Sequence, residues 1–143
     1  DIKILSYVFT VNSDYKTMEG DLSDIEIPVF QTEETTVEKF YLQYDKNDFS
    51  AIAEILTKKN AKPEDVEVFL SQLKEKFNHY GKIKKIEKTD AYEYGEKNDK
   101  GIAIFYKITY ENGEVSFEKF EFSAVDEIGL IQYYNWAEDP EKL

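Results

Sequence analysis

The spacing of apolar residues changes at Gly81, and this change constrains the fold more than any other feature of the sequence. Between Thr35 and Gly81, apolar residues recur every three or four positions, as in helices that pack by one face. After Gly81 they recur at every second position, as in strands with one buried face. We therefore predict an α+β fold in which N-terminal helices pack on a curved antiparallel sheet.

Three helices are predicted, at about residues 35–44, 48–59 and 63–80. Thr35 or Thr36 is the expected N-cap of the first helix, and Asp48 that of the second. Lys58 and Lys59 would lie at the negative end of the second helix dipole. The apolar stripes consist of Val37, Phe40, Tyr41 and Tyr44, then Phe49, Ile52, Ala53 and Leu56, then Val66, Phe69, Leu70, Leu73 and Phe77.

Four strands are predicted, at about residues 83–94, 102–111, 114–124 and 130–136. The dipeptide Asn112-Gly113 separates the second strand from the third. It is the strongest short signal for a β-hairpin with a two-residue turn. We therefore expect the second and third strands to pair through this turn.

A two-residue loop would set Tyr110 opposite Val115 on one face of the sheet. Unbroken pairing would then bury Lys119 and Glu121 beside apolar side chains, which is costly. A one-residue bulge near Glu118 and Lys119 avoids this cost, so we predict a bulge there. The inner face would then be wholly apolar, formed by Ile104, Tyr106, Ile108, Tyr110, Val115, Phe117, Phe120 and Phe122.

The length of 143 residues suits a single domain. We divide it into residues 1–31, an extended arm or extra strand, residues 32–137, the main body, and residues 138–143, a frayed tail. Pro28 argues against a central strand in the arm. The apolar stretch from Ile2 to Val11 is too short to span a membrane. Whether a signal or a lipid anchor precedes Asp1 stays open.

The charge of the chain argues against a nucleic-acid partner. Its formal net charge is -12, and lysine is its only basic residue besides one histidine. Such a chain repels phosphates and lacks arginine for bidentate phosphate contacts. It also has no cysteine, so disulfides and thiolate metal sites are excluded. We expect no metal and no cofactor, because phosphate-loop, nucleophile-elbow and zinc-protease motifs do not occur.

Residues 36–56, TVEKFYLQYDKNDFSAIAEIL, resemble the opening helices of the ketosteroid-isomerase-like or nuclear transport factor 2-like superfamily, a cystatin-like group. The second half, KFNHYGKIKKIEK and then IAIFYKITYENGEVSFEKFEF, is similar to small bacterial exported or lipoprotein members of this superfamily. The resemblance covers about residues 32–137. It implies a conical roll with a pocket at its open end, and an extracytoplasmic location, periplasmic or surface-associated.

The resemblance also implies which residues would line such a pocket. The candidates are Tyr106, Tyr110, Phe117, Tyr41 and Trp136. Enzymes of the superfamily place carboxylates in the pocket, whereas the predicted inner row has none, so we expect no catalytic residue. His79, the only histidine, is expected at the end of the third helix, where the helix dipole favours a cation.

These observations favour a noncatalytic binding or interaction module, with a protein or a small apolar ligand as partner. One alternative is an acidic inhibitor or immunity-type protein that blocks a basic partner in a salt-dependent way. Another is an isomerase-like enzyme that combines pocket tyrosines with a helix carboxylate such as Asp48 or Glu54. A homodimer through the sheets, as the resemblance implies, is also open.

Overall fold

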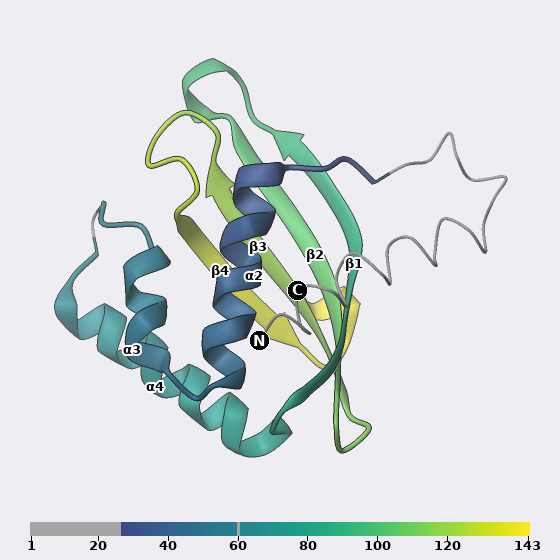
Figure 1. Ribbon diagram of the computed structural model, residues 1–143. Helices are drawn as coiled ribbons and strands as arrows, with labels where there is room; N and C mark the ends of the chain where they lie inside the picture. Colours follow the sequence, from purple (N-terminus) through teal and green to yellow (C-terminus); the bar gives the residue numbers. More distant parts are fainter. Residues whose placement is uncertain (1–26, 60) are drawn as a thin grey trace, which may run out of the picture.

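The computed structural model describes residues 27–59 and 61–143, so the strand or arm expected within residues 1–26 lies outside the described residues. The described part confirms the α+β prediction, because helices precede a four-stranded antiparallel sheet. Figure 1 shows α2 lying across one face of this sheet. The elements are α2 (Gln31–Asp45), α3 (Phe49–Ile52), η2 (Ala53–Ile55), α4 (Pro63–Tyr80), β1 (Ile83–Tyr94), η3 (Lys97–Asp99), β2 (Gly101–Tyr110), β3 (Val115–Ser123), β4 (Ile131–Ala137) and η4 (Pro140–Lys142).

Helix α2 begins earlier than the sequence predicts. Its first turn is held by Glu34, whose carboxylate accepts a hydrogen bond from the Phe30 N–H at 2.8 Å. Thr35 and Thr36, the predicted N-caps, lie inside the helix instead, and Thr36 donates its hydroxyl to the Gly129 carbonyl at 2.5 Å. The predicted cap was wrong because a carboxylate one turn into a helix can satisfy the same kind of unpaired amide as a capping hydroxyl.

The second helix is shorter than predicted, because α3 gives way to the 3-10 turn η2, which ends at Ile55. Asp48 is the N-cap residue as predicted, although its carboxylate accepts from the Ser50 hydroxyl and not from a backbone amide. Leu56 is extended and forms a parallel bridge with Ile131 of β4. The longer helix was a wrong prediction because the sheet edge supplies a backbone partner that the apolar pattern does not reveal.

The β2–β3 hairpin has a three-residue loop in place of the predicted two-residue loop. The Tyr110 N–H donates to the Glu114 carbonyl at 2.9 Å, which leaves residues 111–113 in the loop. Gly113 has a φ of 91°, a conformation that glycine adopts without strain. The additional loop residue shifts the pairing by one position, so Thr109 lies opposite Val115.

This shift makes the predicted bulge unnecessary. Pairing of β2 with β3 is continuous through residues 115–123, so the bulge predicted near Glu118 was wrong. The loop itself supplies the one-residue offset that buries Phe120 and Phe122. Val115 and Phe117 were placed on the wrong face, because the inner positions belong to the buried residues Ser116 and Glu118.

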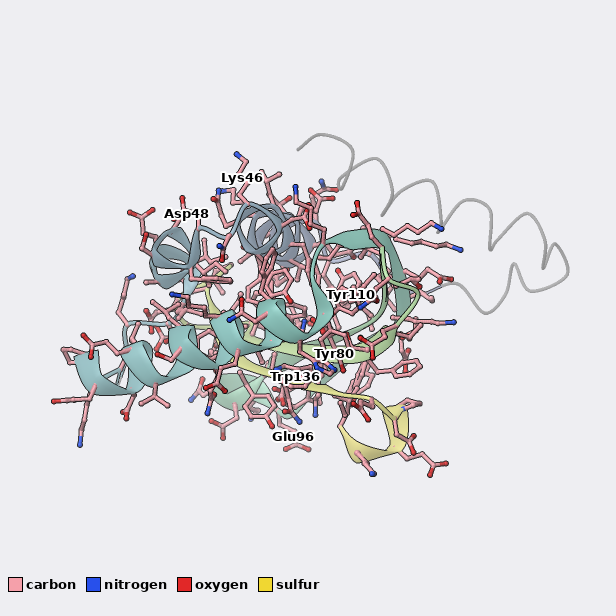
Figure 2. The ribbon with its side chains drawn as sticks, turned by 90° about the horizontal axis from the view of Figure 1, so that it is seen from below. Lys46, Asp48, Tyr80, Glu96, Tyr110 and Trp136 are labelled. Carbon is pink, nitrogen blue, oxygen red and sulfur yellow. The ribbon has the colours of Figure 1, made fainter. Side chains whose placement is uncertain are left out.

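The core lies between the helices and the inner face of the sheet, and it is rich in aromatic rings. The ring centroid of Phe40 in α2 lies 5.0 Å from that of Phe120 and 4.8 Å from that of Tyr134. Tyr80 of α4 stacks on Tyr110 at 4.4 Å, and Figure 2 shows both near Trp136. Each aromatic pair adds about 0.5–1.5 kcal/mol beyond its burial. Among the described helices, none is long and apolar enough to span a bilayer.

Candidate functional site

A buried ion pair joins α4 to the inner face of the sheet. The Lys76 Nζ atom lies 2.7 Å from the Glu118 Oε2 atom, and both side chains are 0% exposed. Lys76 also lies over the Tyr44 ring, 4.5 Å from its centroid. Removing two charges from water is costly unless they are well paired. The contribution of this pair to stability therefore depends on the hydrogen bonds around it.

Hydroxyl groups donate hydrogen bonds to both carboxylate oxygens of Glu118. Its carboxylate accepts hydrogen bonds from Tyr41 at 2.8 Å, from Tyr134 at 2.7 Å and from Ser116 at 2.7 Å. Lys76 donates a further hydrogen bond to the Tyr110 hydroxyl at 2.8 Å. The pair is therefore embedded in a connected network that draws on α2, α4 and three strands, which favours one arrangement of these elements.

Burial changes the ionisation of the groups in this network. Desolvation raises the pKa of Tyr41 and Tyr134 well above the ordinary value, and the charge of Glu118 adds to this effect. Desolvation lowers the pKa of Lys76, although Glu118 opposes that shift. Shifted groups of this kind are often catalytic, but general acid–base catalysis requires contact with a substrate. Both members of the pair at the centre of this network are 0% exposed, so a solute does not contact them in this conformation.

This network does not follow from the apolar pattern of the sequence, for a specific reason. The pattern predicted a bulge at Glu118 and an inner row without carboxylates. The true register puts Glu118 opposite Tyr106, on the inner face. Lys76 gave a signal, since it follows Leu73 by three positions on the apolar stripe of the third helix. Pairing between a lysine and a glutamate on two facing apolar surfaces can be predicted only when the register of both elements is known.

A second buried ion pair anchors the start of α2 to β1. The Lys88 Nζ atom lies 2.8 Å from the Glu34 Oε2 atom, with side chains 3% and 9% exposed. Lys88 also donates to the Pro28 carbonyl at 3.0 Å. Because Glu34 accepts the Phe30 amide as well, this pair fixes the entry of the chain into α2. Its role is again structural.

A pocket lies between the first half of α4 and strand β4. Its volume is about 240 Å³. Phe69 and Tyr134 meet edge to face in it, with ring centroids 6.0 Å apart at an interplanar angle of 82°. Among the described residues that line it, Asp65 is the only charged one. The lining consists of Leu56, Thr57, Ala61, Asp65, Val66, Phe69, Ile131, Gln132, Tyr133 and Tyr134.

The buried network supports one wall of this pocket. The hydroxyl of Tyr134 bonds to Glu118, so the ring that lines the pocket is held at its far end by the core. Phe40 packs behind the same ring, with centroids 4.8 Å apart. Side chains fixed in this way keep the pocket formed without a ligand, and a formed pocket loses less entropy on binding.

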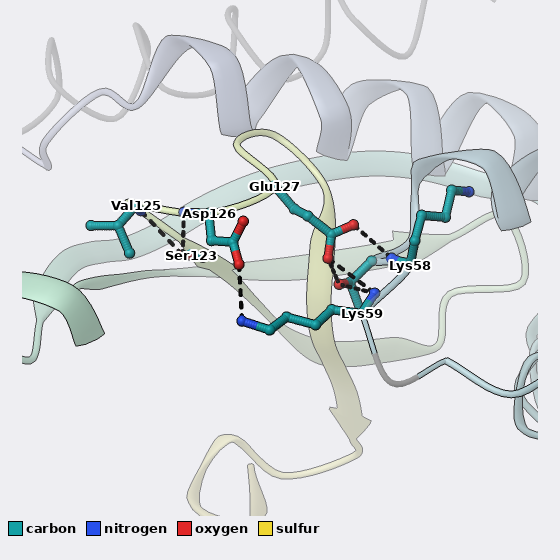
Figure 3. Close-up of polar contacts among 7 residues, drawn as sticks. Lys58, Lys59, Ser123, Val125, Asp126 and Glu127 are labelled. Carbon is teal, nitrogen blue, oxygen red and sulfur yellow. Dashed lines mark hydrogen bonds and ion pairs between the residues drawn. The ribbon is translucent and has the colours of Figure 1, made fainter.

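A carboxylate clamp holds the end of the pocket formed by Leu56 and Thr57. Glu127 accepts hydrogen bonds from the Thr57 hydroxyl at 2.6 Å and from the amides of Lys58 at 2.8 Å and Lys59 at 3.0 Å (Figure 3). These bonds lower the pKa of Glu127, with the Thr57 hydroxyl as the largest cause. The clamp joins the segment after η2 to the loop between β3 and β4, and so positions Leu56 against Ile131.

The five residues predicted to line a pocket lie elsewhere. Tyr41, Tyr106 and Tyr110 are 0–1% exposed and belong to the core. Trp136 is partly buried against that core, and Phe117 lies on the opposite face of the sheet from Tyr106. None of the five lines the pocket between α4 and β4. The structure thus brings four of them together as core and separates Phe117 from them.

The other candidate groups are at the surface. His79 is in the last turn of α4 as predicted, with a side chain 58% exposed and its Nε2 atom 3.9 Å from Glu114. Asp48 and Glu54 are both exposed. Within residues 27–59 and 61–143, no group of three or more His, Cys, Asp or Glu side chains could hold a metal ion.

The pocket was missed because its residues carry an ordinary core pattern. Val66 and Phe69 were assigned to the apolar stripe of the third helix, and both are partly buried. Leu56 was assigned to a helix that ends before it. No local spacing indicates that these positions meet Ile131 across a gap.

Comparison with known proteins gives no significant match to a family model, a curated protein or a solved structure.

Proposed function

We propose that this chain is a noncatalytic binding module whose working site is the pocket between α4 and β4. The observation that carries this proposal is a supported apolar pocket with a single carboxylate, Asp65, in its lining. Pockets for drug-sized molecules measure about 300–1,000 Å³, whereas this one measures about 240 Å³. Its size suits one apolar group, such as an amino-acid side chain.

The distribution of titratable groups favours binding over catalysis. Lys76 and Glu118 would be the strongest acid–base candidates by burial, and they neutralise each other away from the pocket. Besides Asp65, the titratable groups of the described lining are Tyr133 and Tyr134, and the Tyr134 hydroxyl already donates to Glu118. The described lining thus holds no second carboxylate and no histidine to pair with Asp65, which is the pairing that acid–base catalysis most often uses. From the sequence resemblance alone, we also propose an extracytoplasmic location.

A titration with indole, a small neutral aromatic probe, tests this proposal. In ¹H–¹⁵N spectra we expect indole to shift the amide signals of Thr57, Phe69 and Ile131. The variant Ala61→Phe places a ring at the pocket and should abolish these shifts. Val68→Phe adds the same ring to an exposed position of α4 outside the pocket, and should retain them. Shifts that are absent, or that persist in Ala61→Phe, would contradict the proposal.

The second candidate is an acidic inhibitor of a basic partner, and the net charge of -12 favours it. Such a protein would capture its partner through a charged surface, so capture would weaken steeply between 50 and about 500 mM salt as the screening length shortens. Substitution of Ala61 would leave that capture unchanged, whereas it blocks a pocket binder.

A further inference from the structure

Strand β4 is an edge of the sheet, and one backbone contact already extends the sheet beyond it. The strand order is β1-β2-β3-β4. On the outer side of β4 the Thr57 N–H donates to the Ile131 carbonyl at 2.9 Å. Within the described residues, the Leu56–Ile131 bridge is the one backbone pairing that another segment makes to the outer side of β4. The rest of the edge is a template for a further strand.

The pocket and the edge are parts of one surface. Four consecutive residues, 131–134, line the pocket, and they include the first residues of β4. Helix α4 supplies the opposite wall through Val66 and Phe69. An extended segment paired with β4 would therefore run between the strand and the helix. Since side chains of a strand alternate in direction, every second one would point toward α4.

Charge indicates the composition of such a segment. Asp65 is the only charged residue in the part of the lining that the structure describes, and it lies in the first turn of α4, where the helix dipole stabilises a carboxylate. The lysines on either side of Ala61 do not line the pocket: Lys59 is paired with Asp126 at 2.9 Å, and Lys62 is the exposed N-cap residue of α4. The whole chain carries -12, which attracts basic segments and repels acidic ones.

We infer that β4 and its pocket bind a basic, extended segment of a partner protein by strand addition. The backbone of this segment pairs with the free edge of β4, one apolar side chain enters the pocket, and a neighbouring lysine or arginine faces Asp65. This inference rests on the proposed function, because it uses the same pocket. It adds the class of partner and the backbone contact.

The probe is the peptide acetyl-Lys-Val-Phe-Val-Lys-amide, titrated into the full chain by calorimetry. Its first control has the same sequence with N-methyl groups on the three central residues, which removes backbone donors on both edges of the peptide strand and keeps every side chain. Its second control has glutamate in place of both lysines. We expect the N-methyl peptide to bind at least about fivefold more weakly, because each net hydrogen bond contributes about a two- to tenfold factor. The glutamate peptide should bind more weakly still.

Two matched variants test the site on the protein. Asp65→Asn removes the pocket carboxylate, and Glu67→Gln removes an exposed carboxylate of α4 outside the pocket lining. We expect Asp65→Asn to weaken the lysine peptide about threefold or more at low salt, and Glu67→Gln to leave its affinity nearly unchanged.

The outcomes separate this inference from the proposed function. Equal binding of the N-methyl peptide, or no binding of the lysine peptide while indole still binds, would overturn strand addition and leave the pocket function standing. Equal binding of the glutamate peptide would overturn the basic partner. If neither indole nor the peptide binds, both proposals fail. A dimer of this chain that Ala61→Phe disperses would assign the edge to a second copy and overturn the inference.

Discussion

Two buried tyrosines, Tyr41 and Tyr106, differ in the hydrogen bonding of their hydroxyl groups, so the same substitution can be compared at both. Both are 0–1% exposed. The Tyr41 hydroxyl donates to Glu118, whereas the Tyr106 hydroxyl has no hydrogen-bond partner among the described residues. A buried hydroxyl without a partner lowers stability, and a hydrogen bond to a charged group contributes more than one to a neutral group.

We therefore predict opposite effects of the same substitution. Tyr106→Phe should raise the free energy of unfolding by about 1 kcal/mol, and Tyr41→Phe should lower it by about 2 kcal/mol. Urea denaturation followed by fluorescence of Trp136 measures both. A loss of stability in Tyr106→Phe as large as that in Tyr41→Phe would show that the Tyr106 hydroxyl has a partner in solution.

At the scale of elements, the three-residue hairpin loop sets the register of the sheet. Deleting Glu111 leaves Asn112-Gly113 as a two-residue loop between the same flanking residues, Tyr110 and Glu114. The inner face keeps its residues, and one hydrogen bond, from the Glu111 amide to the Lys82 carbonyl, is lost. We expect the deletion to cost about 1 kcal/mol and to leave the fold intact.

Deleting Val115 is the matched control, since it also removes one residue but lies within β3. It moves every later residue of β3 by one position, which directs Lys119 and Glu121 inward and Phe120 outward. We expect this variant not to fold, as judged by the dispersion of its ¹H–¹⁵N spectrum. If both deletions had the same effect, the loop would not be the element that determines the register.

At the scale of the whole molecule, the buried tyrosines make the fold sensitive to alkali. Burial raises the pKa of six buried or partly buried tyrosines above the ordinary value of 10.0, namely Tyr41, Tyr44, Tyr80, Tyr106, Tyr110 and Tyr134. Above pH 10 these side chains ionise in the unfolded chain and stay protonated in the folded one. Unfolding then releases protons, so stability falls as pH rises. Lys76, with its lowered pKa, has the opposite effect, but it is one group against six.

We predict a cooperative loss of structure above pH 10. The free energy of unfolding should fall by about 1.4 kcal/mol per pH unit for each buried tyrosine that ionises on unfolding. Absorbance at 295 nm, which follows tyrosine ionisation, should rise in a step that coincides with the loss of the near-ultraviolet circular dichroism signal. Ionisation of these tyrosines while that signal persists would contradict their burial in the folded state.

Local patterns in the sequence determined the class of fold and the main elements. The switch of period at Gly81 predicted helices before strands, and Pro63 and Gly81 bounded α4 at its observed ends. The inward positions of β2 were predicted because strict alternation depends only on neighbouring residues. These features follow from short-range geometry, so one sequence is enough to find them.

Only the tertiary structure decided the register of β3, the end of the second helix and the place of the pocket. The hairpin loop has one residue more than predicted, and this offset places Glu118 on the inner face of the sheet and not at a bulge. There Lys76 neutralises it. Leu56 pairs with the edge of β4 and does not continue the helix, and in this position it lines the pocket. Each of these outcomes depends on contacts between residues far apart in the chain, and their energies cannot be read from spacing alone.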